Sequence, residues 1–173
     1  MLADDASGRA LLAARYTARA AFIIFTAVFL AGPVTRIWPN AALSGLMRNR
    51  RQLGLALTFV MTAHLAALAV NVGLFRPRRV GALAAGGLVY LLLLAMALTS
   101  NDRVQRRMGR WWRRLHLVGL SALWAGFAFG YIGRLFRAEY FWTGLVFTPV
   151  AIGIVLFRWF AAVRENAKFP ATG

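Results

Sequence analysis

Long apolar runs alternate with short arginine-rich segments along the whole chain. Five runs approach or exceed the ~20 residues that a helix needs to cross a hydrocarbon core of about 30 Å, and the interior of each lacks a charged residue. No alternating strand pattern is present, and lipid-exposed backbone must satisfy its own hydrogen bonds, so we expect helices. The pattern predicts an all-α, polytopic membrane helix bundle of five transmembrane helices, near residues 19–35, 52–75, 80–99, 111–132 and 140–157.

These spans predict a single transmembrane domain between two short tails. We expect an N-terminal tail over 1–18, one transmembrane domain over 19–163 and a C-terminal tail over 164–173. The longest connections, around 36–51 and 100–110, are interpreted as basic loops without domain-sized sequence.

Composition supports the membrane interpretation and narrows the chemistry. Hydrophobic residues make up 60% of the chain and charged residues 15%, and the mean hydropathy is +0.61, which excludes a water-soluble globule. A net charge of +16 alone suggests a nucleic-acid partner. The arginines lie between apolar runs, so we expect a lipid bilayer and no nucleic acid. The absence of cysteine excludes disulfides, thiolate metal sites and iron–sulfur clusters.

The distribution of basic residues predicts the orientation. Thirteen of the 21 lie in the segments 36–51, 103–114 and 158–168, and eight lie in the connections on the opposite side. The positive-inside rule places the richer side in the cytoplasm, with the N-terminus outside and the C-terminus inside. The arginine-rich composition and the lack of a targeting peptide favour the inner (cell) membrane of a bacterium.

Two histidines, His64 and His116, are the most reactive side chains at membrane depth, since no Asp or Glu lies inside a span. Imidazole is a good iron ligand, and facing helices of a bundle can hold haem between axial side chains. Arg113, near the interface, is positioned to pair with a haem propionate. The alternative is that each histidine only forms an interhelical hydrogen bond. No dinucleotide fingerprint or P-loop is present, so any flavin must belong to a partner.

Two sequence motifs favour haem ligation by these histidines over a purely structural role. The segment 50–55 (RRQLGL) leads into 63–65 (AHL), and 97–102 (ALTSND) leads through 105–117 (QRRMGRWWRRLHL). These motifs resemble the ferric-reductase-like transmembrane domain family, and the pattern is most similar to a haem-binding membrane subunit of a bacterial periplasmic reductase system. The segments 32–36 (GPVTR) and 76–78 (RPR) fit the same pattern, so the likeness covers roughly residues 17–163.

The resemblance implies a six-helix bundle with b-type haem held by histidines on the helices that correspond here to the second and fourth spans. Metal ligation then falls to His64 and His116. The resemblance also implies electron transfer from a flavin or quinol donor to an acceptor, through a flavin-bearing or periplasmic oxidoreductase partner. The basic residues Arg51 and Arg113 would neutralise the propionates or dock an acidic partner.

The chain departs from the family pattern in two places. It lacks the first helix of the family, and Phe129 stands where a second histidine of the fourth span is expected. His64 and His116 also lie at different distances from the starts of their spans, whereas one iron needs both nitrogens at nearly the same depth. If His64 belongs with the missing position, the remaining haem is five-coordinate, takes a substitute ligand such as Met61 or Met96, or is absent.

Two functions follow. The first is a haem b-binding membrane electron carrier, at most the membrane subunit of an oxidoreductase. The alternative is a non-catalytic structural subunit that has lost part of its haem site and packs in a larger complex.

Overall fold

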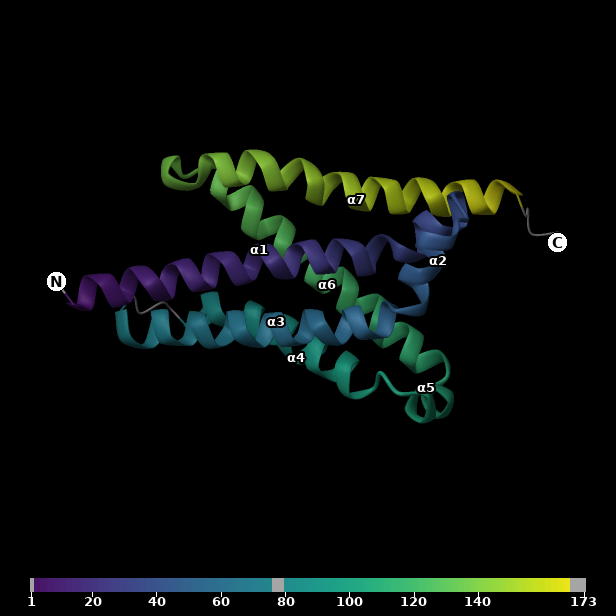
Figure 1. Cartoon of the computed structure of the whole chain (residues 1–173), viewed down its shortest axis with the longest axis horizontal. Helices are drawn as coiled ribbons and strands as arrows, with labels where there is room; N and C mark the ends of the chain where they lie inside the picture. The colour runs from purple at the N-terminus through teal and green to yellow at the C-terminus, as the bar shows by residue number, and fades with distance from the viewer. Residues whose placement is uncertain (1, 76–79, 169–173) are drawn as a thin grey trace. The chain divides into compact units, whose positions relative to one another are not determined.

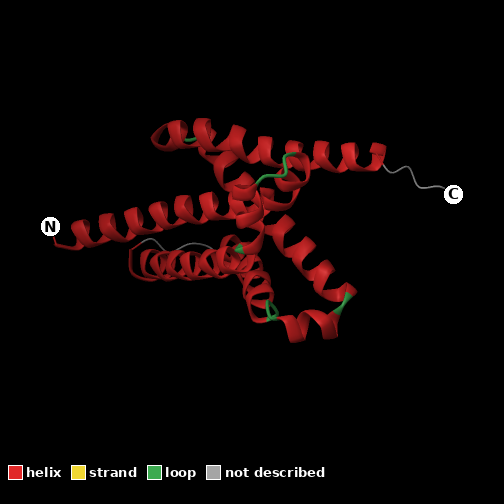
Figure 2. Ribbon diagram, turned by 45° about the vertical axis from the view of Figure 1, so that its right-hand side comes forward, coloured by secondary structure: helices red, strands yellow, loops and turns green. Residues whose placement is uncertain are grey.

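The computed structural model describes residues 2–75 and 80–168 of the 173-residue chain. Every regular element within these ranges is a helix (Figures 1 and 2). The α-helices are α1 (Leu2–Ile37), α2 (Ala41–Arg48), α3 (Arg50–Val70), α4 (Val80–Leu98), α5 (Asp102–Met108), α6 (Arg110–Leu135) and α7 (Phe141–Lys168). A π-helical turn, η1 (Asn71–Phe75), follows α3, and a 3-10 turn, η2 (Ala138–Tyr140), precedes α7.

The predicted all-α, polytopic bundle is confirmed. Four stretches of the described chain are long and apolar enough to cross a membrane, and α4 adds a fifth when it is counted with α5, from which it is bent by 107°. The four stretches are Ala6–Ile37, Arg50–Phe75, Arg110–Leu135 and Ala138–Glu165. Each of the five predicted spans therefore lies on one of the long helices.

The long helices extend beyond the apolar runs that predicted them. Helix α1 begins at Leu2, so the described part of the expected N-terminal tail is helical, and α7 continues into the expected C-terminal tail as far as Lys168. Charged residues such as arginine and glutamate end an apolar run but are good helix formers, so the helix continues where the sequence turns polar. The family-like segment 76–78 and Arg79 lie outside the described residues.

Short helices occupy the two connections that the sequence analysis interpreted as loops. In α2 the side chain of Asn40 accepts a hydrogen bond from the backbone N–H of Leu43, and in α5 Asn101 accepts one from Val104, at 2.9 and 2.8 Å. Asparagine at these N-cap positions satisfies a backbone donor that would otherwise be unpaired. Helix α5 stops at Gly109, whose φ of 53° lies in the left-handed region that glycine adopts readily. The loop prediction was wrong because it relied on charge and ignored these caps.

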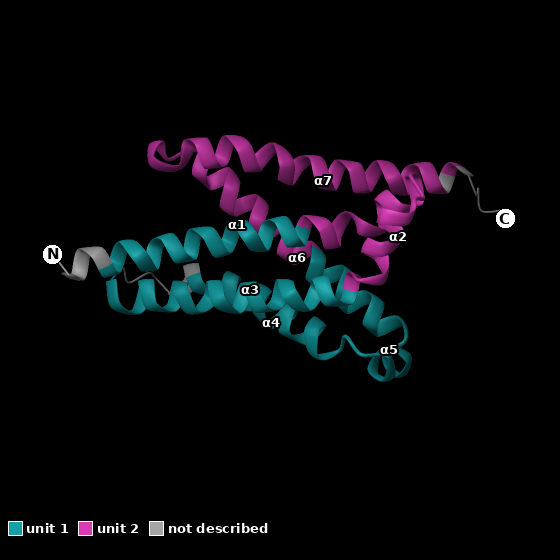
Figure 3. Cartoon of the chain, in the orientation of Figure 1, with its two compact units in different colours: residues 1–25, 51–120 teal, residues 26–50, 121–173 magenta. Residues whose placement is uncertain are grey.

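The chain divides into two compact units (Figure 3). Unit 1 comprises Met1–Phe25 and Arg51–Leu120, and it contains both histidines. Within it, the hydroxyls of Thr62 on α3 and Tyr90 on α4 lie 2.9 Å apart. Phe22, Phe25 and Leu57 are among its most deeply buried side chains.

Unit 2 comprises Thr26–Arg50 and Ser121–Gly173. Its helices α6 and α7 are joined by a hydrogen bond from the indole of Trp124 to the carbonyl of Ala151, at 2.8 Å. The rings of Tyr131 and Phe147 stack with their centroids 4.8 Å apart. The hydrogen bond to Ala151 satisfies the indole N–H of Trp124, which lipid cannot do.

Helices α4 and α6 of unit 1 approach closely at Gly119. A Cβ at this position would meet the sulfur of Met96 at 2.5 Å and its methyl carbon at 2.9 Å. We expect Gly119→Ala to lower the free energy of unfolding by about 1–3 kcal/mol, the usual cost of an overpacked site. Thermal unfolding in detergent, followed by circular dichroism, measures this change.

Two further variants check the cause. Gly126→Ala, on the same helix, is the matched control, because no atom lies within 4 Å of its added Cβ. In a Met96→Ala background the cost of Gly119→Ala should largely disappear, since the obstructing thioether is gone. An unchanged cost in that background would show that Met96 is not the obstacle.

Candidate functional site

His64 lies in the middle of α3 and faces α1. Its Nδ1 lies 2.9 Å from the carbonyl oxygen of Ala14 and 3.3 Å from the hydroxyl of Thr17. The Thr17 hydroxyl donates its own proton to the carbonyl of Ala13, at 2.7 Å, so its oxygen acts as an acceptor toward the imidazole. Because a carbonyl oxygen only accepts, the His64 Nδ1 is the donor and carries the proton.

His116 lies near the start of α6 and has a different environment. Its Nδ1 donates to the carbonyl of Trp112 one turn earlier, at 3.0 Å, and its ring stacks on the Trp112 ring with centroids 3.9 Å apart. The imidazole is half-buried, as is that of His64. Trp112 therefore fixes both the tautomer of His116 and one face of its ring.

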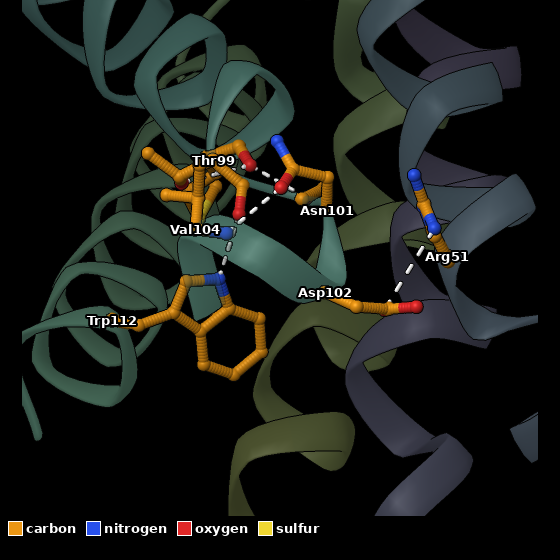
Figure 4. Close-up of polar contacts among 8 residues, drawn as sticks. Arg51, Thr99, Asn101, Asp102, Val104 and Trp112 are labelled. Atoms are coloured by element: carbon orange, nitrogen blue, oxygen red, sulfur yellow. Dashed lines mark hydrogen bonds and ion pairs between the residues drawn. The ribbon is translucent and has the colours of Figure 1, made fainter. Parts of the chain in front are cut away.

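Polar contacts of Trp112, which stacks on His116, form a corner between α4, α5 and α6 (Figure 4). The indole N–H of Trp112 donates to the carbonyl of Thr99 at the end of α4, at 3.1 Å. Two residues later Asn101 caps α5, and Asp102 in its first turn lies 3.9 Å from Arg51 on α3. The corner thus lies between the start of α3 and the helix that carries His116.

Arg51, Arg113 and His116 lie at or next to this corner, whereas His64 lies elsewhere. Arg51 lies within ion-pair distance of Asp102, and the exposed Arg113 follows Trp112 directly, three residues before His116. His64 instead contacts α1 and lies 13 residues beyond Arg51, roughly 20 Å along a straight helix. The contact with Asp102 is exposed, with 53% and 76% of the two side chains accessible, so it contributes little to stability.

The helix starts refine the relative heights of the histidines. His64 lies 14 residues after the first residue of α3, and His116 lies six after that of α6. Counted from the nearest preceding basic residues, Arg51 and Arg114, the offset is 11 residues, but α6 begins at Arg110, four residues before Arg114. The remaining eight residues correspond to about 12 Å along straight, parallel helices. A single iron bound by both histidines therefore requires α3 and α6 to be tilted relative to each other, so that this offset is closed.

The structure adds a polar residue that the sequence analysis did not select. Asn71, seven residues after His64, begins the π-helical turn and is 2% exposed. Its side-chain nitrogen is buried and has no hydrogen-bond partner among the described residues. A buried donor without a partner is costly and calls for an explanation such as a bound group. Single π-helical turns are also frequent at functional sites.

The three other positions considered for the haem site, Met96, Met61 and Phe129, differ in their burial. Met96 is 6% exposed and its sulfur packs at Gly119, one turn beyond His116. Met61 is half-buried on α3. Phe129, in unit 2, is 76% exposed.

The donor set fits haem. In the neutral form of each histidine the proton is on Nδ1, so the ligating lone pair is on Nε2. Metal-ligating histidines commonly donate their other ring N–H to a backbone carbonyl, which fixes the ring and raises its basicity. Both candidate histidines have this hydrogen bond, to Ala14 and Trp112 respectively. The orphaned amide of Asn71 is consistent with an additional group close to α3.

The fold and these residues define a class of protein: a polytopic α-helical membrane protein with two histidines on separate spans. Curated relatives identify the family. The chain is 32% identical to the protein-methionine-sulfoxide reductase haem-binding subunit MsrQ of Cronobacter sakazakii, over 83% of this chain and 72% of that protein. It is 35% identical to the same subunit of Pasteurella multocida, over 61% of this chain and 53% of that protein. For Yersinia pseudotuberculosis the identity is 34%, over 58% and 52%.

The chain therefore belongs to the MsrQ family, and it is a bacterial membrane protein. This confirms the resemblance to a haem-binding membrane subunit that the two motifs indicated. No family model and no solved structure matches the chain.

Proposed function

We propose that this chain is a haem b-binding membrane subunit that passes electrons from a separate flavin or quinol donor to an external acceptor. The observation that carries the proposal is the shared hydrogen bonding of His64 and His116, each of which donates from Nδ1 to a backbone carbonyl. Membership of a family whose curated members are named haem-binding subunits supports it.

Each residue of the site has a defined task. His64 and His116 present Nε2 as metal ligands, and the carbonyls of Ala14 and Trp112 hold their rings in that tautomer. Arg51 and Arg113 neutralise the propionates, and their positive charge favours the reduced form. Haem b, when bound, supplies a one-electron couple between ferric and ferrous iron.

The partner and the orientation complete the proposal. The acceptor is an oxidoreductase partner on the outer side, and the flavin belongs to a partner because this chain has no nucleotide fingerprint. The chain lies in the inner membrane with its N-terminus outside and its C-terminus in the cytoplasm, as the excess of basic residues on one side indicates.

The optical spectrum of the purified protein tests the proposed function. Preparations from haem-replete cells should have a b-type Soret band that shifts when dithionite is added. A reduced-minus-oxidised spectrum in mild detergent measures this shift. A colourless preparation would overturn the proposal, because no other group in the proposal carries the electron.

One observation favours a second candidate, the non-catalytic structural subunit. Phe129, at the position where the family resemblance predicts a histidine, is an exposed aromatic ring rather than an inward-facing ligand. Exposed apolar surface of this kind can pack against another membrane protein. Isolation in mild detergent separates the candidates: a structural subunit co-purifies with a larger complex and is colourless, whereas a free monomer argues against this role.

A further inference from the structure

A basic surface surrounds α5 in unit 1. It consists of exposed arginines on α5 and the first turns of α6: Arg103, Arg106, Arg107, Arg110 and Arg114. Asp102 is the only acidic residue between 102 and 114, and it is paired with Arg51. We refer to these five residues as the α5 basic surface. Its charge complements an anionic ligand.

The direction of α5 places this surface at the height of lipid headgroups. Helix α4 is uncharged throughout, and α5 is bent by 107° from it after a three-residue connection. If α4 crosses the bilayer, α5 then lies close to the membrane plane at the end of that span. Val104 and Met108, one turn apart, are half-buried, while Arg103, Arg106 and Arg107 are exposed. The face of α5 that the protein leaves exposed is therefore basic.

The exposed ring of Trp111 independently indicates that this part of the chain lies at the membrane–water interface. Its ring is 58% exposed, and the guanidinium carbons of Arg110 and Arg114 lie 6.0 and 5.0 Å from the ring centroid. Tryptophan is enriched at membrane–water interfaces, because its ring is amphipathic. Arginines held over its faces can contact phosphate without leaving that level.

We propose that the α5 basic surface binds the phosphate groups of anionic phospholipids in the leaflet where α4 ends. Guanidinium groups form paired hydrogen bonds with phosphate oxygens, and basic clusters next to a membrane span attract anionic lipids. An acidic protein would also complement the charge. The position of α5 at the end of a span, beside Trp111, favours lipid. This inference does not depend on haem.

Native mass spectrometry of the full chain tests the proposal. The detergent-solubilised protein is titrated with equal amounts of phosphatidylglycerol and phosphatidylcholine, and the lipids retained are counted. We expect clear retention of phosphatidylglycerol over phosphatidylcholine. Substituting Arg103→Gln, Arg106→Gln and Arg107→Gln together should reduce this preference about tenfold or more.

The matched control removes the same charge from exposed arginines elsewhere, by Arg48→Gln, Arg137→Gln and Arg164→Gln. It should retain the wild-type preference. Equal retention of both lipids by the wild type would overturn the proposal even if the α5 variant did not fold, as would an unchanged preference in a folded α5 variant. Displacement of phosphatidylglycerol by inorganic phosphate or by polyglutamate would also overturn it, and would assign the surface to a free anion or to an acidic protein, respectively.

Discussion

Replacing either His64 or His116 with alanine should reduce the haem-to-protein ratio of the purified chain about tenfold or more. Loss of a hydrogen-bonded partner of a ligand alone typically costs 10–100-fold in metal affinity, and loss of the ligand should cost at least as much. The pyridine haemochrome assay, normalised to protein concentration, measures the ratio. Imidazole added to the growth medium and buffers should restore part of the haem, because it can replace the missing ring.

The next residue on each helix offers a matched control. Leu65 and Leu117 are exposed, and Leu65→Ala and Leu117→Ala should retain haem at the wild-type ratio. Full haem in His116→Ala, with loss only in His64→Ala, would show that the two histidines do not share one iron. Full haem in both histidine variants would show that neither is a ligand.

Among the glycines whose surroundings the structure describes, Gly144 should be the one at which alanine is most destabilising. A Cβ here would lie 2.8 Å from the backbone nitrogen of Leu135 and 3.1 Å from the carbonyl carbon of Arg134. Both are backbone atoms at the end of α6, which cannot move aside as the flexible Met96 side chain can. We expect a loss of about 3 kcal/mol or more, at or above the upper end of the usual range for overpacking, measured by thermal unfolding in detergent.

Gly153→Ala is the control on the same helix, because its added Cβ meets no atom within 4 Å. It should leave the stability unchanged or raise it slightly, since alanine favours helix over glycine. If Gly144→Ala unfolded at the same temperature as Gly153→Ala, the close approach of α7 to the end of α6 would be contradicted.

The membrane spans could be predicted well because one physical effect dominates them. The predicted run 80–99 corresponds to α4, and 111–132 lies within α6, since removing apolar side chains from water outweighs local preferences over such lengths. The ends were less predictable. Helix α1 continues through the arginines before residue 19, because charge ends a membrane span without ending a helix.

The short helices α2 and α5 could have been predicted only from their capping residues. Both α2 and α5 follow an asparagine cap, and α5 stops at a glycine with positive φ. These local signals are present in the sequence, but seven or eight residues are too few for hydrophobic periodicity to identify a helix.

The environment of the histidines could be predicted only in part. The stacking of His116 on Trp112 and its hydrogen bond to the Trp112 carbonyl follow from a separation of four residues on one helix. The contact of His64 with Ala14 depends on how α1 packs against α3, which a single sequence does not encode in any short pattern. For the same reason the burial of Asn71 could not be deduced from its type.

The number of haems per chain, together with their ligands, decides whether His64 and His116 share one iron. We expect one haem b per chain, with His64 and His116 as its two ligands. Haemochrome stoichiometry on the purified wild-type chain, with near-infrared magnetic circular dichroism to identify the axial ligands, measures both quantities. One haem with two imidazole ligands would confirm this expectation. No haem, or two haems each holding one of the histidines, would contradict it.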